Sequence, residues 1–204
     1  MPKNDAWNLR YLQKSTPWDF ATAHPELENI FLQYVPLESR ILEVGCGTGA
    51  NSIFLNKIGY TVTAVDVAEE AIRLARAKAS TVNFKVLNFL TDAESLDRFD
   101  AIIDCAVLPV LTSHEREIFV KNIADKCLAN GVWINISCSK DESHAIEQAT
   151  GVQAPPFLTA SKIINLAEPF FELLEMRRCI FTIQRKDLCV DFNAWVSVFK
   201  RRIH

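Results

Sequence analysis

The segment from residue 40 to residue 66, RILEVGCGTGANSIFLNKIGYTVTAVD, constrains the fold of this chain more than any other. Apolar residues at 41, 42 and 44 predict a strand buried on both faces, and glycines at 45, 47 and 49 follow it. A helix is expected from Ala50, and a second strand ends at Asp66. Glycines let a ligand approach the backbone, and the N-terminus of the next helix adds a partial positive charge. This order predicts a nucleoside-containing cofactor, with Asp66 accepting hydrogen bonds from the ribose.

Two cofactor classes are compatible with this pattern. Gly45-x-Gly47-x-x-Ala50, with Asp66 downstream, satisfies the dinucleotide-binding fingerprint. However, Glu43 lies just before the first glycine, an unusual place for a carboxylate unless it meets a cation or N–H groups. The heptapeptide EVGCGTG at 43–49 closely resembles motif I of the class I S-adenosylmethionine-dependent methyltransferases. An acid at this loop suits the sulfonium and ammonium of that cofactor and would repel a pyrophosphate.

Composition narrows the class of protein. With 204 residues, 49% hydrophobic and 23% charged, the chain can form one domain with a full core. A net charge of −3 argues against a dedicated nucleic-acid binder, and no apolar run is long enough for a membrane span. The N-terminus lacks the apolar core of a signal peptide, and the six cysteines form no CxxC pair. We therefore expect a cytoplasmic protein with reduced thiols and no metal site, no nucleic-acid partner and no membrane.

The alternation of predicted elements indicates an α/β fold. Strands are expected at 41–44, 61–65, 82–87, 100–104, 132–138, 170–183 and 194–199, the last two joined through a polar turn at 185–187. Helices are expected at 25–35, from 50, at 68–79, from Thr112 for about 18 residues up to Gly131, and at 160–168. This order predicts a doubly wound, mostly parallel seven-stranded sheet with a late antiparallel strand.

The predicted organisation is a single domain over residues 1–204. Residues 1–36 are expected to form a helical lid segment, 37–204 an α/β core, and 139–158 a loop on the substrate side. A narrower resemblance supports this division. The segment TPWD at 16–19, motif I, Asp66, and the segment PPF at 155–157 together resemble the small thiopurine S-methyltransferase-like and tellurite-resistance-like group. In that group a lid carrying the Trp-Asp pair covers the cofactor, and small, often soft nucleophiles are methylated.

The resemblance implies a set of cofactor-binding residues: Trp18, Glu43, Gly45, Cys46, Gly47, Asp66, Val67, Asn88, Phe89, Cys105 and Ala106. Glu43 would neutralise the ammonium, and the backbone of the glycine loop would hold the methionine end. Asp66 would take the ribose hydroxyls, while Val67, Asn88 and Phe89 would meet the adenine. The backbone at 105–106 would lie near the sulfonium, and Trp18 would close the site. Many members of the group carry Asp-Arg-Gly where this chain has Asp104-Cys105-Ala106.

The expected function is transfer of a methyl group from S-adenosylmethionine to a small-molecule nucleophile such as a thiol, releasing S-adenosylhomocysteine. A soft anion needs no general base, whereas an oxygen or nitrogen nucleophile does. Asp104, Asp141 and His144 are the candidates for that base, with solvation or loop capping as the alternative for each. An NAD-type oxidoreductase and a non-catalytic binding module for the same nucleoside are the alternative functions. The sequence does not predict the oligomeric state.

Overall fold

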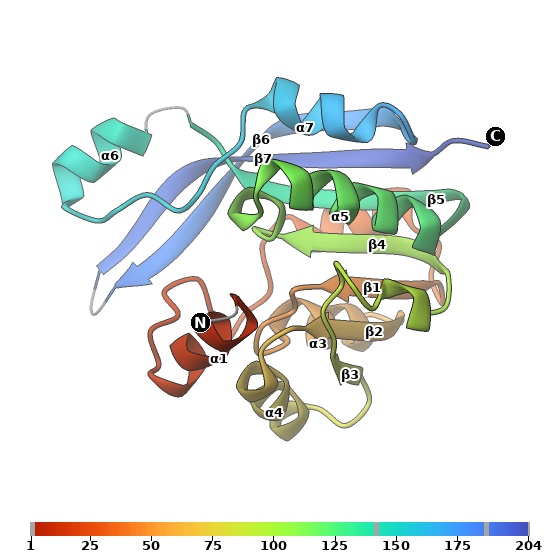
Figure 1. The fold of residues 1–204 in the computed structure, drawn as a ribbon, viewed down its shortest axis with the longest axis horizontal. Helices are drawn as coiled ribbons and strands as arrows, with labels where there is room; N and C mark the ends of the chain where they lie inside the picture. The colour runs from red at the N-terminus through yellow and green to blue at the C-terminus, as the bar shows by residue number, and fades with distance from the viewer. Residues whose placement is uncertain (1–2, 141–142, 186–187, 204) are drawn as a thin grey trace.

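The computed structural model describes residues 3–140, 143–185 and 188–203, and a seven-stranded sheet lies at its centre (Figure 1). The strands follow the order β3-β2-β1-β4-β5-β7-β6. The five parallel strands are β1 (Arg40–Val44), β2 (Thr61–Asp66), β3 (Asn83–Val86), β4 (Phe99–Cys105) and β5 (Cys127–Cys138). The antiparallel strands are β6 (Phe171–Arg185) and β7 (Leu188–Arg201). The predicted α/β fold with a late antiparallel strand is confirmed.

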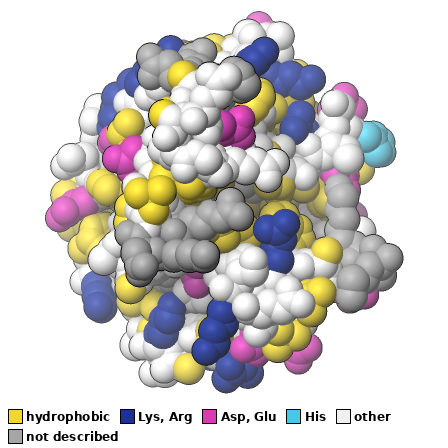
Figure 2. Space-filling view, turned by 90° about the vertical axis from the view of Figure 1, so that its left-hand side faces the viewer, with side chains coloured by type: hydrophobic (Ala, Val, Ile, Leu, Met, Phe, Trp, Pro, Cys, Tyr) yellow, Lys and Arg dark blue, Asp and Glu magenta, His cyan; other side chains and the backbone are white. Residues whose placement is uncertain are grey.

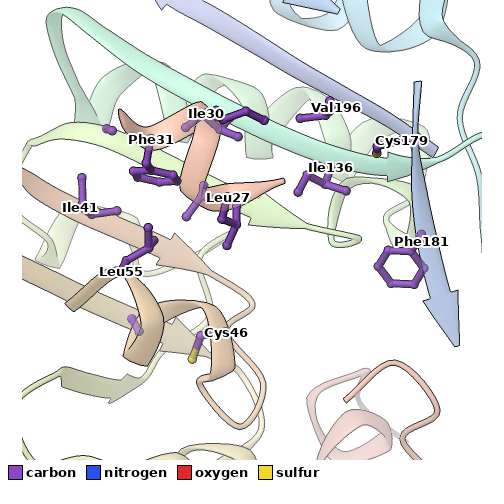
Figure 3. Close-up of a cluster of buried hydrophobic side chains, with 14 of the residues drawn as sticks. Leu27, Ile30, Phe31, Ile41, Cys46, Leu55, Ile136, Cys179, Phe181 and Val196 are labelled. Carbon is purple, nitrogen blue, oxygen red and sulfur yellow. The ribbon is translucent and has the colours of Figure 1, made fainter. Parts of the chain in front are cut away.

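Helices cover both faces of this sheet. Side chains of α2 (Leu27–Tyr34), α3 (Ala50–Lys57) and α4 (Glu69–Lys78) pack into the core of one face. Figure 3 shows Phe31 of α2 and Leu55 of α3 in that core, with Ile41 of β1 beside them. Side chains of α5 (Ser113–Lys126) and α7 (Ala160–Ala167) pack into the core of the other face. No helix in the described residues is long and apolar enough to cross a membrane.

The capping signals placed helix starts better than helix ends. The Thr112 hydroxyl accepts from the Glu115 amide and the Glu115 carboxylate accepts from the Thr112 amide, which confirms the predicted capping box of α5. The predicted end of α5 at Gly131 is wrong, because the helix stops at Lys126 and β5 begins at the next residue. Gly131 lies inside β5, where a Cβ would come within 2.7 Å of the Asp100 carbonyl oxygen. The glycine is needed there for close strand packing.

The edge of the sheet that holds the carboxyl ends of the parallel strands is enclosed by segments distant in sequence. Helix α1 (Lys3–Leu12) and α6 (Ser143–Thr150) both lie on this side (Figure 1). Helix α6 falls within residues 139–158, which the sequence predicted as a loop.

Strands β6 and β7 pair beyond the last β5 partner, from Ile180↔Asn193 to Arg185↔Leu188, and form a projecting ribbon. This pairing confirms the predicted hairpin; residues 186 and 187 of its turn lie outside the described residues. The Gln184 amide of the ribbon donates to the Pro17 carbonyl at 2.7 Å. This bond ties the N-terminal segment to the ribbon.

Candidate active site

The glycine loop has a conformation that only glycine adopts readily. Gly45, Gly47 and Gly49 have φ of 73°, 54° and 84°. A Cβ on Gly45 would lie 2.2 Å from a methyl of Val107, and one on Gly47 would lie 2.9 Å from the Tyr11 hydroxyl. The loop is therefore held between the turn after β4 and the N-terminal segment.

Asp66 at the end of β2 holds the glycine loop through hydrogen bonds to backbone amides. Its carboxylate accepts from the amides of Gly47 and Ala68, each at 2.9 Å. Burial raises the pKa of Asp66, and these amide donors oppose the shift. Each carboxylate oxygen keeps a further lone pair, so a ribose hydroxyl can still bind. Asp66 is not the N-cap of α4; that position belongs to Ala68, which lacks a capping side chain.

Glu43 is placed differently from the expectation. It is 1% exposed, and its two oxygens accept from the Asn51 amide at 2.9 Å and from the Ser52 hydroxyl. The Asn51 oxygen in turn accepts from the His24 amide at 3.0 Å. Burial raises the pKa of Glu43 to about 7. Its placement does not support direct contact with an ammonium group, because both oxygens are directed at α3.

The N-terminal segment lies over the loop, as the lid prediction for Trp18 requires. The Trp18 indole donates to the Tyr11 hydroxyl at 3.4 Å, and Tyr11 is 6% exposed. The Thr48 hydroxyl donates to Asp19 at 2.7 Å and accepts from Lys78 at 2.5 Å.

Tyr11 and Asp19 were absent from the predicted site. The available signals were the Trp7–Tyr11 spacing, which puts both residues on one helix face, and the TPWD segment that contains Asp19. Tyr11 packs against Trp7, Ala68 and Ala71 in a small cluster between α1 and α4. The helical spacing of Trp7 and Tyr11 therefore identifies the face of α1 that packs against α4.

The turn after β4 is shaped by Asp104. This carboxylate is fully buried and accepts from Trp133 at 2.9 Å, Asn135 at 3.0 Å and the Leu108 amide at 3.2 Å. Burial raises its pKa to about 6. The prediction of Asp104 as a general base is wrong, because its oxygens are fully engaged and reach no surface. It positions the turn in which Ala106 takes a φ of 61°.

The two other candidate bases are Asp141 and His144. Asp141 lies outside the described residues, and His144 lies in α6. Among the described residues, no group of three His, Cys, Asp or Glu side chains could hold a metal ion.

The residues predicted around the adenine divide into two groups. Val67 and Asn88 are half-buried and follow the ends of β2 and β3. Asn88 also closes its own turn by accepting from the Leu90 amide at 3.0 Å. The prediction that Phe89 lines the adenine is wrong. Phe89 is 5% exposed and its ring centroid lies 5.4 Å from that of Phe119, so its side chain belongs to the core.

Cys46 is a small buried filler of the glycine loop. It is 7% exposed, and burial raises the pKa of its thiol well above the usual value. This environment does not suit a reactive thiol, which needs a lowered pKa and access to solvent.

Beyond β4 the carboxyl edge is apolar. Cys138, Cys179 and Phe181 are buried in one cluster, and the half-buried Cys105 and Trp18 pack against it. Figure 3 shows Cys179 and Phe181 at the ribbon end of this cluster. Burial raises the pKa of Cys179 to about 12 and those of Cys105 and Cys138 in the same direction, so these thiols are neutral. Figure 2 shows hydrophobic side chains across the middle of this face, with a Lys or Arg side chain among them.

The loop fits a cationic nucleoside better than a dinucleotide. The amides of Gly45 and Cys46 donate to the Val65 carbonyl at 2.8 and 3.1 Å, and the Gly47 amide donates to Asp66. These N–H groups are therefore not available to a pyrophosphate, which needs them at such a loop. The carboxylates of Asp19 and Asp66 also flank the loop and favour positive charge.

Known proteins agree with this geometry. Residues 41–131 match a family model described as a methyltransferase domain. A putative methyltransferase of Geobacillus is 42% identical over 67 residues, which cover 31% of this chain and 27% of that protein. A probable S-adenosyl-L-methionine-dependent methyltransferase, TehB of Haemophilus influenzae, is 27% identical over 95 residues, or 45% and 33% of the two chains. This chain therefore spans less than two thirds of the length of either relative.

A solved structure shares the whole fold. The S-adenosylmethionine-dependent methyltransferase of Anabaena variabilis superposes with a TM-score of 0.83 at 20% identity, covering 99% of this chain and 96% of that one. The fold and the matching domain model, with TehB among the matches, confirm the resemblance seen in the sequence. The chain therefore matches a methyltransferase domain over residues 41–131 and has the fold of the S-adenosylmethionine-dependent methyltransferases.

Proposed function

We propose that this chain methylates a small, uncharged acceptor with an apolar body and a soft nucleophilic atom such as a thiol. When bound, S-adenosylmethionine supplies an electrophilic methyl group that is transferred by in-line displacement. The observation that carries the proposal is the junction of two surfaces: a glycine loop flanked by carboxylates, and an apolar edge with neutral thiols beside it.

The residues of the chain would position the cofactor and the acceptor and exclude water from the site. Asp66 and the loop backbone would hold the nucleoside, and the adenine would lie near Val67 and Asn88. Tyr11 and Trp18 would exclude water from above. Holding nucleophile, methyl carbon and sulfur in line can contribute roughly 7–11 kcal/mol. Such a mechanism depends mainly on geometry.

The charges at the acceptor end favour a neutral acceptor. Cys105 lies within the electrostatic field of Glu43 and Asp104, and Arg177, the cation near Cys179, is paired with Glu26 and Glu175. An acceptor that carries an anionic group besides its reacting sulfur would therefore be disfavoured near Cys105. The imidazole of His24 lies at this end, and both of its ring nitrogens are hydrogen-bonded. One bonds the Ile180 carbonyl at 3.0 Å, and the other accepts from the Glu26 amide at 3.3 Å, so neither is free to act as a general base. The acceptor thiol would lose its proton to solvent before the segment closes, and its sulfur would then attack the methyl carbon as the bond from that carbon to the cofactor sulfur breaks.

A turnover panel tests this proposal. Release of S-adenosylhomocysteine is measured with apolar thiols, charged thiols, phenols and tellurite as acceptors. We expect turnover with the apolar thiols and little with the oxyanion. Turnover with charged acceptors alone would contradict the proposal, and tight S-adenosylhomocysteine binding without turnover on any acceptor would favour a non-catalytic module.

A variant pair at the acceptor end sharpens the test. Cys105→Asp introduces a charge into the apolar edge and should lower kcat/KM for apolar thiols by about tenfold or more, because a buried carboxylate is costly there. Cys105→Ser is the matched neutral control and should lose less. Equal losses in both variants would mean that charge does not govern acceptor choice.

A further inference from the structure

The N-terminal segment brings a carboxylate to the glycine loop that no motif assigns. An oxygen of Asp19 lies 3.7 Å from where a Cβ on Gly47 would be, and it accepts from the Thr48 hydroxyl at 2.7 Å. Asp19 is half-buried, so it keeps a face toward solvent or a ligand. Asp66 holds the same loop from the opposite side through the Gly47 amide. Two carboxylates therefore converge on one short stretch of backbone.

This negative charge lacks a direct counter-ion in the part of the chain that the structure describes. Neither Asp19 nor Asp66 forms an ion pair with a described residue. Lys78 reaches Asp19 only through the Thr48 hydroxyl. Arg10 of the same segment lies against the Trp18 ring instead, with its guanidinium carbon 5.4 Å from the ring centroid. A cationic ligand group would relieve the repulsion between the carboxylates of Asp19 and Asp66.

Glu43 cannot contact a cationic ligand group directly, because it is 1% exposed and bonded to Asn51 and Ser52. We infer that Asp19, and not Glu43, binds the ammonium group at the methionine end of the cofactor. The lid then contributes a charged contact as well as an apolar cover, so binding of the amino-acid end and closure of the segment are coupled. The inference rests on the cofactor of the family and does not depend on the acceptor proposed above.

Calorimetric titration with two ligands tests the inference without any acceptor. One ligand is S-adenosylhomocysteine, and the other is the same thioether with hydrogen in place of the α-amino group. Asp19→Asn should weaken S-adenosylhomocysteine by about 10- to 100-fold, the range for a lost hydrogen bond to a charged group, and should barely change the desamino ligand. Equal weakening of both ligands would overturn the inference, because it would show that Asp19 only latches the segment.

Three further variants distinguish a structural role of Asp19, which holds the N-terminal segment on the loop, from its proposed contact with the ammonium group. Thr48→Val removes the hydroxyl bonded to Asp19 but keeps the carboxylate, so it should affect both ligands alike. Asp19→Glu restores the charge and should recover part of the preference for the amino group. Glu43→Gln should leave that preference intact; its loss in Glu43→Gln, with retention in Asp19→Asn, would return the ammonium contact to Glu43. Ligand-free melting of each variant shows whether it is folded.

Discussion

At the ends of β1 and β2 the chain places carboxylates, and every one of them is hydrogen-bonded: Glu43 to α3 and Asp66 to the loop and the start of α4. At the ends of β4 and β5 and along the ribbon it places neutral thiols and aromatic rings. We call the first region the nucleoside half and the second the acceptor half. They share one sheet edge and differ in most of the side chains they present, although the buried carboxylate of Asp104 lies in the acceptor half and the buried thiol of Cys46 in the nucleoside half.

Under the function proposed above, this difference would let one edge hold a constant ligand and a variable one. Hydrogen bonds from fixed backbone amides orient the polar groups of the nucleoside half, which suits recognition of one defined molecule. The acceptor half offers non-directional contacts, which select by size and polarity. Its side chains come from β4, β5, β6 and the N-terminal segment, so small changes in any of them can alter acceptor choice.

The largest expected effect concerns Glu43 in the nucleoside half. Its pKa is raised to about 7 in the folded protein, so the neutral form stabilises the fold at low pH and this stability is lost as pH rises through 7. From pH 4.5 to 8 the loss is roughly 3 kcal/mol. Glu43→Gln cannot ionise and should remove this part of the pH dependence, as measured by urea unfolding at both pH values.

Two controls isolate the Glu43 effect. Asp104, whose pKa is raised to about 6, contributes in the same direction in both proteins, so the difference between their curves reports Glu43. Glu117→Gln on the exposed surface of α5 should follow the wild-type curve. Parallel curves for wild type and Glu43→Gln would show that the buried carboxylate is not the source.

The next effect concerns cofactor affinity. Asp66→Ala removes the acceptor of two loop amides and the proposed ribose contact, so S-adenosylhomocysteine should bind about 1–3 kcal/mol more weakly. Asp66→Asn keeps the shape and one acceptor oxygen and should lose less. Titration calorimetry measures both variants, and unchanged affinity in the two would place the nucleoside elsewhere.

The smallest effect tests the independence of the opposite face. Thr112→Ala breaks the capping box of α5 and should lower the free energy of unfolding by about 1 kcal/mol. Cofactor affinity should not change, because α5 packs on the face opposite α3. A shift in S-adenosylhomocysteine affinity in this variant would show that the two faces are coupled.

The nucleoside half was more accessible to sequence analysis than the acceptor half. Its strand, glycine loop, helix and second strand are contiguous, and the observed β1, α3 and β2 follow the prediction closely. The errors at Glu43 and Phe89 concern which way a side chain faces. That choice depends on the helix packed against it, α3 for Glu43 and α5 for Phe89. No local pattern contains this information.

The sequence by itself determined the sheet and the glycine loop, because strand and loop conformations follow from local residue types and their spacing. The preference for a cationic nucleoside came from the resemblance of residues 43–49 to motif I. Only the tertiary structure decided what meets above the loop. Thr48 and Asp19 are 29 residues apart, and Asn51 and His24 are 27 apart. Which distant residues come together depends on the packing of the whole core, because each contact forms only when the elements on both sides are already in place.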